Sequence, residues 1–223
     1  MKNKILSVLF AVSLFFLILS FSIGLPIYCR PFYYAHIDRM ELPDRSGFSR
    51  EEIVDAYNEV LDYLTIPGAP FGTGVMRHSA EGAAHFADCK VLFDLNATIL
   101  LLSAVTVTLI LVLYKRKKVE SLRLGTFSAS FYAAVAAITV PLSVGFLASR
   151  NFDRAFTVFH EIFFPGKDNW TFYPNQDQII QVMPQEFFRN CAILIGAGIL
   201  VFSLTLITIE LARTINRKTK NAP

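Results

Sequence analysis

The sequence NATILLLSAVTVTLILVLY occupies residues 96–114 and carries no charge over nineteen positions. As a helix it would cover ~28 Å at ~1.5 Å per residue, close to the ~30 Å hydrocarbon thickness of a bilayer. The basic cluster Lys115-Arg116-Lys117-Lys118 follows at once and ends the apolar run. This stretch therefore predicts a membrane-spanning helix with a positively charged end.

Three further uncharged runs of comparable length extend this prediction to the whole chain. With 53% hydrophobic residues among 223, the chain is more apolar than a soluble globular domain. We predict an all-α integral membrane protein, a single membrane domain over residues 1–223, with four transmembrane helices and a small helical extracytoplasmic cap. The spans are expected at about 5–27, 95–114, 126–149 and 190–210, with the cap at 28–94 and an outer loop at 150–189.

The charged residues orient these helices. Residues 1–4, 115–124 and 212–223 hold eleven Lys and Arg, against the acids Glu120 and Glu210 on the same side, a net charge of +9. The other segments hold ten basic residues and sixteen acids, a net charge of −6, which agrees with the total of +3. Because cytoplasmic loops are enriched in Lys and Arg, we predict cytoplasmic termini and outward-facing segments 28–94 and 150–189.

The first apolar run has an alternative interpretation as a secretory signal peptide, because Lys2 and Lys4 precede it. Its uncharged core, Ile5–Ile27, is longer than the roughly 7–15 residues typical of such peptides, and no A-x-A cleavage site follows. We therefore expect an uncleaved span.

A cluster of titratable residues directly precedes the stretch 96–114. Glu81, His85 and Asp88 have the spacing i, i+4, i+7, which places them on one helical face. A histidine between two carboxylates beside the membrane is a candidate catalytic residue, with Glu81 or Asp88 fixing its tautomer. The alternative is a contact with a helix end or a lipid headgroup.

Two shorter helices are predicted in the outward segments. Ser49-Arg50-Glu51-Glu52 fits a capping box that opens a helix ending near Leu64. Its apolar stripe is Ile53, Tyr57, Val60, Leu61 and Leu64. The phenylalanines of 152–163 recur at helical spacing and predict an amphipathic helix in the membrane interface. The aromatic residues of 30–34 are expected in an interfacial belt.

The second outward segment contains four motifs, FHEIFF at 159–164, WTFYP at 170–174, DQII at 177–180 and PQEFF at 184–188. In order and spacing they resemble the bacterial lipoprotein intramolecular transacylase family. The upstream pattern Glu81-x3-His85-x2-Asp88-x-Lys90 resembles another signature of that family, and four spans match its architecture.

The resemblance implies an acyltransferase of the bacterial cytoplasmic membrane with its active site on the extracytoplasmic face. Such enzymes move the sn-2 acyl chain of a diacylglyceryl-cysteine lipoprotein onto the α-amino group of that cysteine, which gives an N-acyl lyso-form lipoprotein. Neither a cofactor nor a second lipid donor is implied. The expected partners are diacylated lipoproteins and membrane lipids, and not nucleic acid.

The resemblance also implies which residues carry the reaction. The catalytic residues are His85 and His160, and the supporting or substrate-orienting residues are Glu81, Asp88, Lys90, Glu161, Trp170 and Asp177. An O-to-N acyl shift needs a base for the amine proton, an acid for the departing alkoxide and donors for the oxyanion. An α-amino group titrates near ~8 and a histidine near ~6.5, so histidine suits these roles. We expect His85 as the base and His160 as the donor, although the sequence leaves the two roles interchangeable.

Two other functions remain open at this point. One is a membrane metalloenzyme using His85, His160 and a carboxylate, although no H-E-x-x-H motif is present. The other is a non-catalytic binding or assembly subunit.

Several remaining residues have simpler expected roles. Cys89 allows a covalent Cys-His route, but we expect direct transfer, because the amine is already tethered near the ester. The three cysteines show no disulfide framework, and His36 and His78 match no motif and are expected at the surface. Arg77 and Arg154, together with Lys90, are candidate contacts for a headgroup phosphate or for the substrate.

Overall fold

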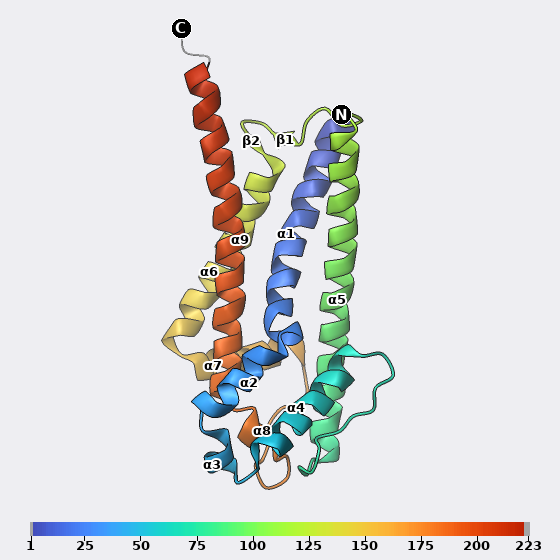
Figure 1. The fold of residues 1–223 in the computed structure, drawn as a ribbon, viewed down its shortest axis with the longest axis vertical. Helices are drawn as coiled ribbons and strands as arrows, with labels where there is room; N and C mark the ends of the chain where they lie inside the picture. The colour runs from blue at the N-terminus through green and yellow to red at the C-terminus, as the bar shows by residue number, and fades with distance from the viewer. Residues whose placement is uncertain (1, 221–223) are drawn as a thin grey trace. The chain divides into compact units, whose positions relative to one another are not determined.

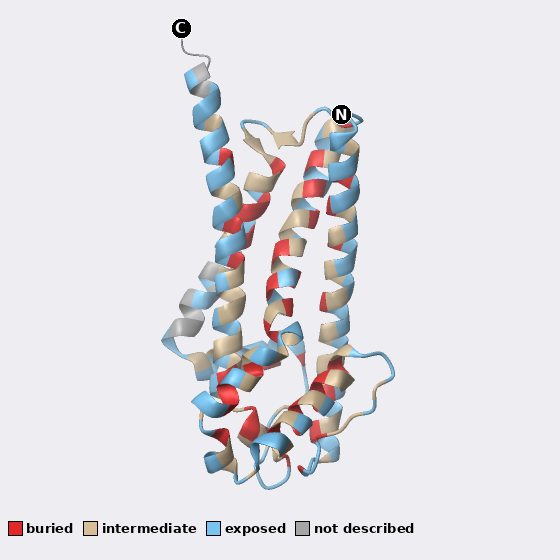
Figure 2. Ribbon diagram, viewed as in Figure 1, coloured by how far each residue is buried: buried red, intermediate tan, exposed pale blue. Residues whose placement is uncertain are grey.

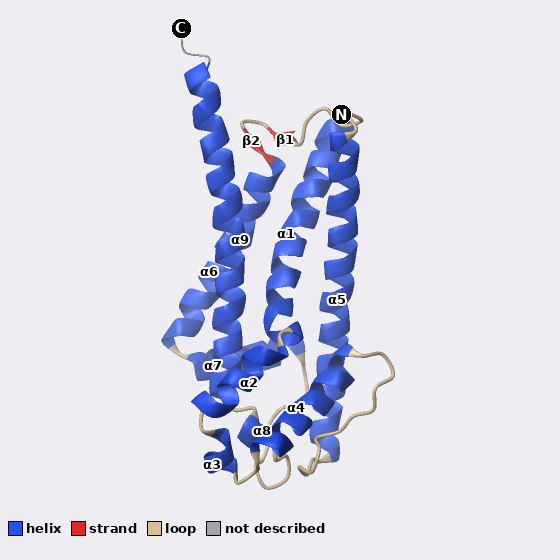
Figure 3. Ribbon diagram, in the orientation of Figure 1, coloured by secondary structure: helices blue, strands red, loops and turns tan. Residues whose placement is uncertain are grey.

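A computed structural model describes residues 2–220, without the side chains of residues 2, 140, 142, 144, 146–149, 218 and 220. Within that range the chain is almost entirely helical (Figure 3), which confirms the all-α prediction. The helices are α1 Lys2–Tyr28, α2 Arg30–Arg39, α3 Leu42–Ser46, α4 Arg50–Thr65, α5 Ala80–Lys115, α6 Ala129–Arg150, α7 Phe152–Phe163, α8 Ile179–Val182 and α9 Gln185–Lys220. The short strands β1 Arg123–Leu124 and β2 Phe127–Ser128 pair as an antiparallel hairpin.

Three of the described helices are long and apolar enough to cross a membrane. They are Asn3–Tyr28 in α1, Ala80–Lys115 in α5 and Gln185–Arg217 in α9. The run predicted at 126–149 corresponds to α6, which begins only at Ala129 because the residues before it form β2. The described apolar part of α6, Ala129–Thr139, is shorter than a span, and much of the rest of this predicted span lies outside the described side chains. Four spans therefore remain a prediction.

Helix α5 is longer than a membrane crossing requires. Its 36 residues would extend ~54 Å, against a hydrocarbon thickness of ~30 Å. Its charged residues before the basic end, Glu81, Asp88, Lys90 and Asp94, all precede residue 95. We therefore treat only residues 95–114 as membrane-spanning and place the first fifteen residues of α5 outside the hydrocarbon.

The first of two compact units contains α1 up to Gly24, residues 97–146 and the chain from Leu194 onward. Apolar side chains form two small clusters in it, one with Phe10, Val107, Ile110 and Ala129, the other with Ile18, Ala137 and Ile199. The buried carboxylate of Glu210 accepts a hydrogen bond from the Ser128 backbone N–H at 3.0 Å and from Arg123 Nη1 at 3.3 Å. These bonds connect the β-hairpin to α9.

The second unit contains residues 25–96 and 147–193, and its core lies between α2, α3, α4 and α8 (Figures 1 and 2). The predicted capping box is confirmed, since Ser49 Oγ accepts from the Glu52 N–H at 3.2 Å and Glu52 Oε2 accepts from the Ser49 N–H at 2.7 Å. The predicted apolar stripe of α4 is buried throughout. Ile179 and Val182 of α8 belong to the same core, so the DQII motif supplies one core residue, Ile179.

Two predictions about the segment after α1 are wrong. Tyr33 is fully buried in this core rather than in an interfacial belt, with its ring stacked 3.7 Å from that of Tyr57 and its hydroxyl donating to the Val182 carbonyl at 2.7 Å. His36 is also buried, and its Nδ1 donates to the Phe32 carbonyl at 2.7 Å. Tyr33 packs against α4 and α8, and His36 lies against Phe187 of α9, contacts that local sequence patterns do not reveal. His78, as expected, is exposed.

Candidate active site

The second unit brings His85 and His160 together from different helices. His85 lies near the start of α5 and His160 near the end of α7, seventy-five positions later in the chain. Their ring centroids are 5.7 Å apart, with the planes at 32°, and the residues are only 7% and 6% exposed. The paired position predicted for these histidines is therefore present in the structure.

Aromatic side chains enclose the two imidazoles. Phe164 lies 5.0 Å from the ring of His85 and 5.7 Å from that of His160. Phe172 lies 5.5 Å from His85, and Trp170 stacks on His160 at 4.8 Å. Such surroundings exclude water and disfavour the charged form of a histidine.

The hydrogen bond made by His160 determines which of its nitrogens is free. Its Nδ1 lies 2.7 Å from the carbonyl oxygen of Phe156, one helical turn earlier. A carbonyl can only accept, so Nδ1 carries the proton and the neutral ring presents the lone pair of Nε2. Burial lowers the pKa of His160, while the hydrogen bond to Phe156 opposes that shift. Neutral His160 is therefore placed to accept a proton at Nε2.

His85 has a different environment. Burial, assisted by the neighbouring His160, lowers its pKa to about 4, with Asp88 acting in the opposite direction and Lys167 in the same one. Its Nε2 lies 3.4 Å from Cys89 Sγ. Its Nδ1 is buried and has no hydrogen-bond partner among the described residues. His85 is therefore neutral at physiological pH and holds an unused polar atom inside an apolar enclosure.

Asp88 makes different contacts from those expected. Its carboxylate accepts a hydrogen bond from Lys167 Nζ at one oxygen and from Asn169 Nδ2, at 3.0 Å, at the other. These two donors hold the pKa of Asp88 below its usual range, despite an opposing effect of burial. Within the described residues His85 donates no hydrogen bond to Asp88 or to the exposed Glu81, so the expected fixing of its tautomer by a carboxylate is wrong. Asp88 instead connects α5 to the segment that follows α7.

Asp177 connects the same segment to the beginning of α5. It is 3% exposed, and its Oδ1 accepts from the Ser79 backbone N–H at 2.8 Å and from Ser79 Oγ at 2.9 Å. Ser79 Oγ in turn accepts from the Gly82 N–H at 2.9 Å, as an N-cap residue does. A Cβ on Gly82 would lie 2.2 Å from Asp177 Oδ1, so a larger residue there would displace the Asp177 carboxylate. We refer to Asp177, Ser79 and Gly82 as the α5 clamp.

The other predicted supporting residues divide into two groups. Trp170 reaches the site, because it stacks on His160 while its Nε1 donates to the Lys167 carbonyl at 2.9 Å. Lys90 faces α4 instead, where its Nζ donates to the Tyr63 carbonyl at 2.5 Å. Glu161 is exposed and has no hydrogen bond within the described residues. Lys90 and Glu161 thus have no contact with the histidines.

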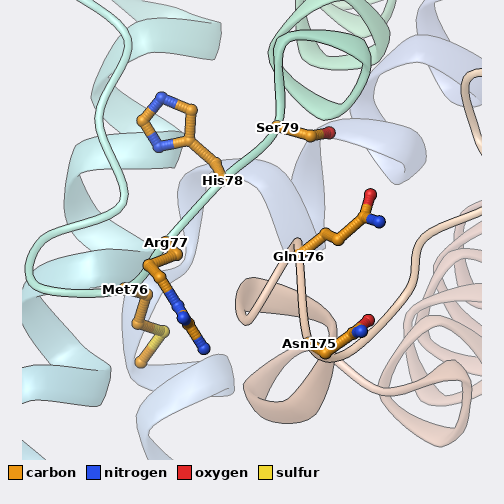
Figure 4. A pocket seen from close by; sticks show the side chains of 6 residues that line it. All are labelled: Met76, Arg77, His78, Ser79, Asn175 and Gln176. Atoms are coloured by element: carbon orange, nitrogen blue, oxygen red, sulfur yellow. The ribbon is translucent and has the colours of Figure 1, made fainter.

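A surface pocket of about 540 Å³ opens beside the α5 clamp (Figure 4). It is lined by Met76, Arg77, His78, Ser79, Asn175 and Gln176. Neither catalytic candidate lines it, so we locate the chemistry at the enclosed histidine pair rather than in this hollow. Arg77 belongs to the pocket lining, and its backbone N–H donates to Gln178 Oε1 at 2.8 Å, next to the clamp.

Sequence reasoning missed Lys167, Asn169 and Ser79, all of which hold or approach the site. Lys167 and Asn169 lie between the FHEIFF and WTFYP motifs, outside the predicted helix, and no pattern in the sequence marks them as site residues. In the described part of the chain no three His, Cys, Asp or Glu residues gather as metal ligands, and the three cysteines are free.

Comparison with known proteins gives a consistent result. A family model described as lipoprotein intramolecular transacylase Lit matches residues 8–188. The fold is similar to the membrane-integral lipoprotein intramolecular transacylase Lit from Bacillus cereus, with a TM-score of 0.85, 22% identity and 99% of each chain covered. The structure of that protein with an H85R mutation matches with a TM-score of 0.78 and 22% identity, covering 99% of this chain and 95% of the other. No curated protein matches the chain in sequence.

Proposed function

Because this chain belongs to the lipoprotein intramolecular transacylase family, a family of acyltransferases, we propose that it moves the sn-2 acyl chain of a diacylglyceryl-cysteine lipoprotein to the α-amino group of that cysteine. The product is an N-acyl lyso-form lipoprotein. The observation that carries this proposal is the enclosed pair of His85 and His160, each with one ring nitrogen free of other strong partners.

His160 acts as the proton carrier. The amine nitrogen attacks the ester carbonyl, a C–N bond forms, and the amine loses one proton to His160 Nε2. Collapse of the tetrahedral intermediate breaks the bond between the acyl carbon and the sn-2 oxygen of the glyceryl group, and His160 returns the proton to that departing alkoxide oxygen. The proton balance closes within one molecule, so no cofactor or second lipid is needed. Because amine and ester share that molecule, positioning contributes a large part of the rate.

His85 stabilises the oxyanion. Burial raises the pKa of the Cys89 thiol to about 12, so Cys89 is neutral and its S–H can donate to His85 Nε2. The ring proton then resides on Nδ1, which is buried and unused, and which is available to donate to the developing negative charge. A pKa near 4 makes His85 a weak base. The geometry thus favours the reverse of the roles expected from the sequence.

The route is direct, without an acyl-thioester on Cys89. A thiol with a pKa near 12 contains almost no thiolate at neutral pH, and the thiolate is the nucleophile. We expect Cys89→Ser to keep full activity, since its hydroxyl still donates to His85. Cys89→Val should lose less than ~10-fold, the value of one weak hydrogen bond. A rate assay checks this, and a hydroxylamine-sensitive adduct on Cys89 together with an inactive Cys89→Val would contradict it.

In the membrane we propose four spans within one functional domain, with cytoplasmic termini and the histidine pair on the extracytoplasmic face. The charge difference of +9 against −6 supports this orientation. The exposed apolar residues of α7 support a contact with membrane lipids near the site. They are Val158, Phe159, Ile162 and Phe163, exposed by 41% to 66%.

Cysteine labelling checks this orientation. In a background without the three native cysteines, Asp62→Cys should react with an impermeant maleimide added to intact cells. Lys220→Cys should react only after the membrane is opened, because the basic segments remain inside. The reverse labelling pattern would contradict the orientation.

A crossover assay tests the function itself. Two model lipopeptides of different peptide mass are mixed with the purified protein, one of them carrying a deuterated sn-2 chain. We expect mass spectrometry to find the deuterated chain only on the amine of its own peptide. Scrambling of the label, or an unchanged ester, would contradict an intramolecular transfer.

A further inference from the structure

Asn169 carries a polar atom that the mechanism above does not use. Its Nδ2 donates to Asp88 Oδ2 at 3.0 Å, whereas its Oδ1 is buried and has no hydrogen-bond partner among the described residues. An unsatisfied buried acceptor destabilises the folded protein and calls for an explanation.

The orientation of this carboxamide is fixed by its partner. An ionised carboxylate only accepts hydrogen bonds, and the other oxygen of Asp88 is occupied by Lys167 Nζ. Turning the amide over would place its carbonyl oxygen against the negative charge of Asp88. Oδ1 therefore points away from Asp88 and needs a donor from elsewhere.

Asn169 is connected to the elements that carry both histidines through Asp88 and Trp170. Asp88 lies three residues after His85 in α5, which is nearly one helical turn. Trp170, the residue after Asn169, stacks on the ring of His160 at 4.8 Å. Asn169 is therefore linked to His85 through Asp88 and to His160 through Trp170.

We propose that Asn169 Oδ1 binds the α-amino group of the lipoprotein cysteine by accepting one of its N–H bonds. The proposal rests on the function and site proposed above. Of the reacting groups in that substrate, the ester oxygens and the thioether sulfur have no hydrogen to donate, and only the amine does.

With this contact, each of the two hydrogens of the neutral amine has its own acceptor. One hydrogen leaves to His160 Nε2 as the C–N bond forms. The other stays on nitrogen, donates to Asn169 Oδ1 and directs the nitrogen lone pair toward the ester carbonyl. The amide product keeps that one N–H. Asn169 is thus a catalytic residue specific for a primary amine.

A comparison of two substrates tests the proposal. One is a diacylated lipopeptide with a free α-amino group, and the other carries an N-methyl group and therefore has a single hydrogen for two acceptors. We expect the wild-type protein to prefer the primary amine by about 10- to 100-fold. Asn169→Ala should slow the primary amine by about the same factor and the N-methyl substrate by less than ~3-fold, so that the preference disappears.

Lys167→Ala is the matched control. It removes the other hydrogen bond to Asp88 and leaves Asn169 Oδ1 in place, so any loss should be equal for both substrates. Equal losses in Asn169→Ala would mean that Oδ1 binds a water or that Asn169 only braces Asp88, and would overturn the proposal. If Asn169→Ala fails to accumulate, the wild-type protein still tests the proposal: equal rates for the primary amine and the N-methyl substrate would overturn it.

These outcomes are separate from a failure of the proposed site. If His85→Ala and His160→Ala both keep normal activity, the site itself is wrong. If both are inactive while Asn169→Ala slows the two substrates equally, only the role of Asn169 is lost.

Discussion

His160→Gln is expected to lose acyl transfer by ~10²–10⁴-fold, the usual effect of removing a general base. Glutamine fills a similar volume and can still offer an N–H donor, but it has no lone pair on nitrogen for the amine proton. If His160 only donated a hydrogen bond to the oxyanion, glutamine would keep part of the rate. The substitution therefore separates the two roles.

His85→Asn is the complementary variant. The amide nitrogen of asparagine lies about where Nδ1 of histidine lies, and it donates a hydrogen bond. We expect His85→Asn to keep at least ~10-fold more activity than His85→Ala, because an oxyanion donor contributes ~10²–10³-fold. Lyso-lipoprotein formation by purified variants of equal membrane accumulation measures both effects. An active His160→Gln with an inactive His85→Asn would restore the roles expected from the sequence.

Asp177→Ala is expected to destabilise the second unit by ~3 kcal/mol or more. The buried carboxylate accepts hydrogen bonds from the backbone and side chain of Ser79, and bonds to charged groups contribute ~1.5–3 kcal/mol each. Its loss leaves the partly buried Ser79 N–H without this partner and frees the segment that carries Asn169 and Trp170 from the start of α5. Trp170 is the sole tryptophan, so its fluorescence reports thermal unfolding of this unit in detergent.

A second substitution distinguishes loss of the α5 clamp from a nonspecific destabilisation of the second unit. In the wild-type protein Gly82→Ala places a Cβ against Asp177 Oδ1 and should destabilise by ~1–3 kcal/mol. In the Asp177→Ala background that obstacle is gone, and alanine should stabilise the helix by ~1 kcal/mol relative to glycine. The effect of Gly82→Ala thus changes sign. Equal effects in both backgrounds would contradict the clamp.

Predictions that depended on local pattern agree with the structure. The capping box at Ser49 and Glu52, the buried stripe of α4 and the helix α7 all follow from contacts between residues three or four positions apart. The two histidines required more than periodicity, since they lie on separate helices, and the family resemblance supplied that pairing.

Predictions that depended on distant contacts were wrong or missing. Lys167 meets Asp88 across 79 positions, and Asp177 meets Ser79 across 98. No local pattern shows that Asp88 is occupied by such partners, so a carboxylate at i+3 from a histidine was read as its partner. The burial of His36 and Tyr33 was missed for the same reason, because Val182 of α8 meets Tyr33 and Phe187 of α9 meets His36 from about 150 positions later in the chain.

The continuity of α5 has a mechanical consequence. His85 stands on the same unbroken helix as residues 95–114, so the tilt of that span affects the height of its imidazole relative to the bilayer surface. A span that is too long for its bilayer tilts, and one that is too short draws the surrounding lipids thin. The acyl chains of the substrate hold its ester in the lipid, while His85 is held by helix α5. The rate of acyl transfer should therefore depend on bilayer thickness. In reconstituted vesicles, changing the acyl-chain length of the surrounding lipids should change this rate without any change in the protein.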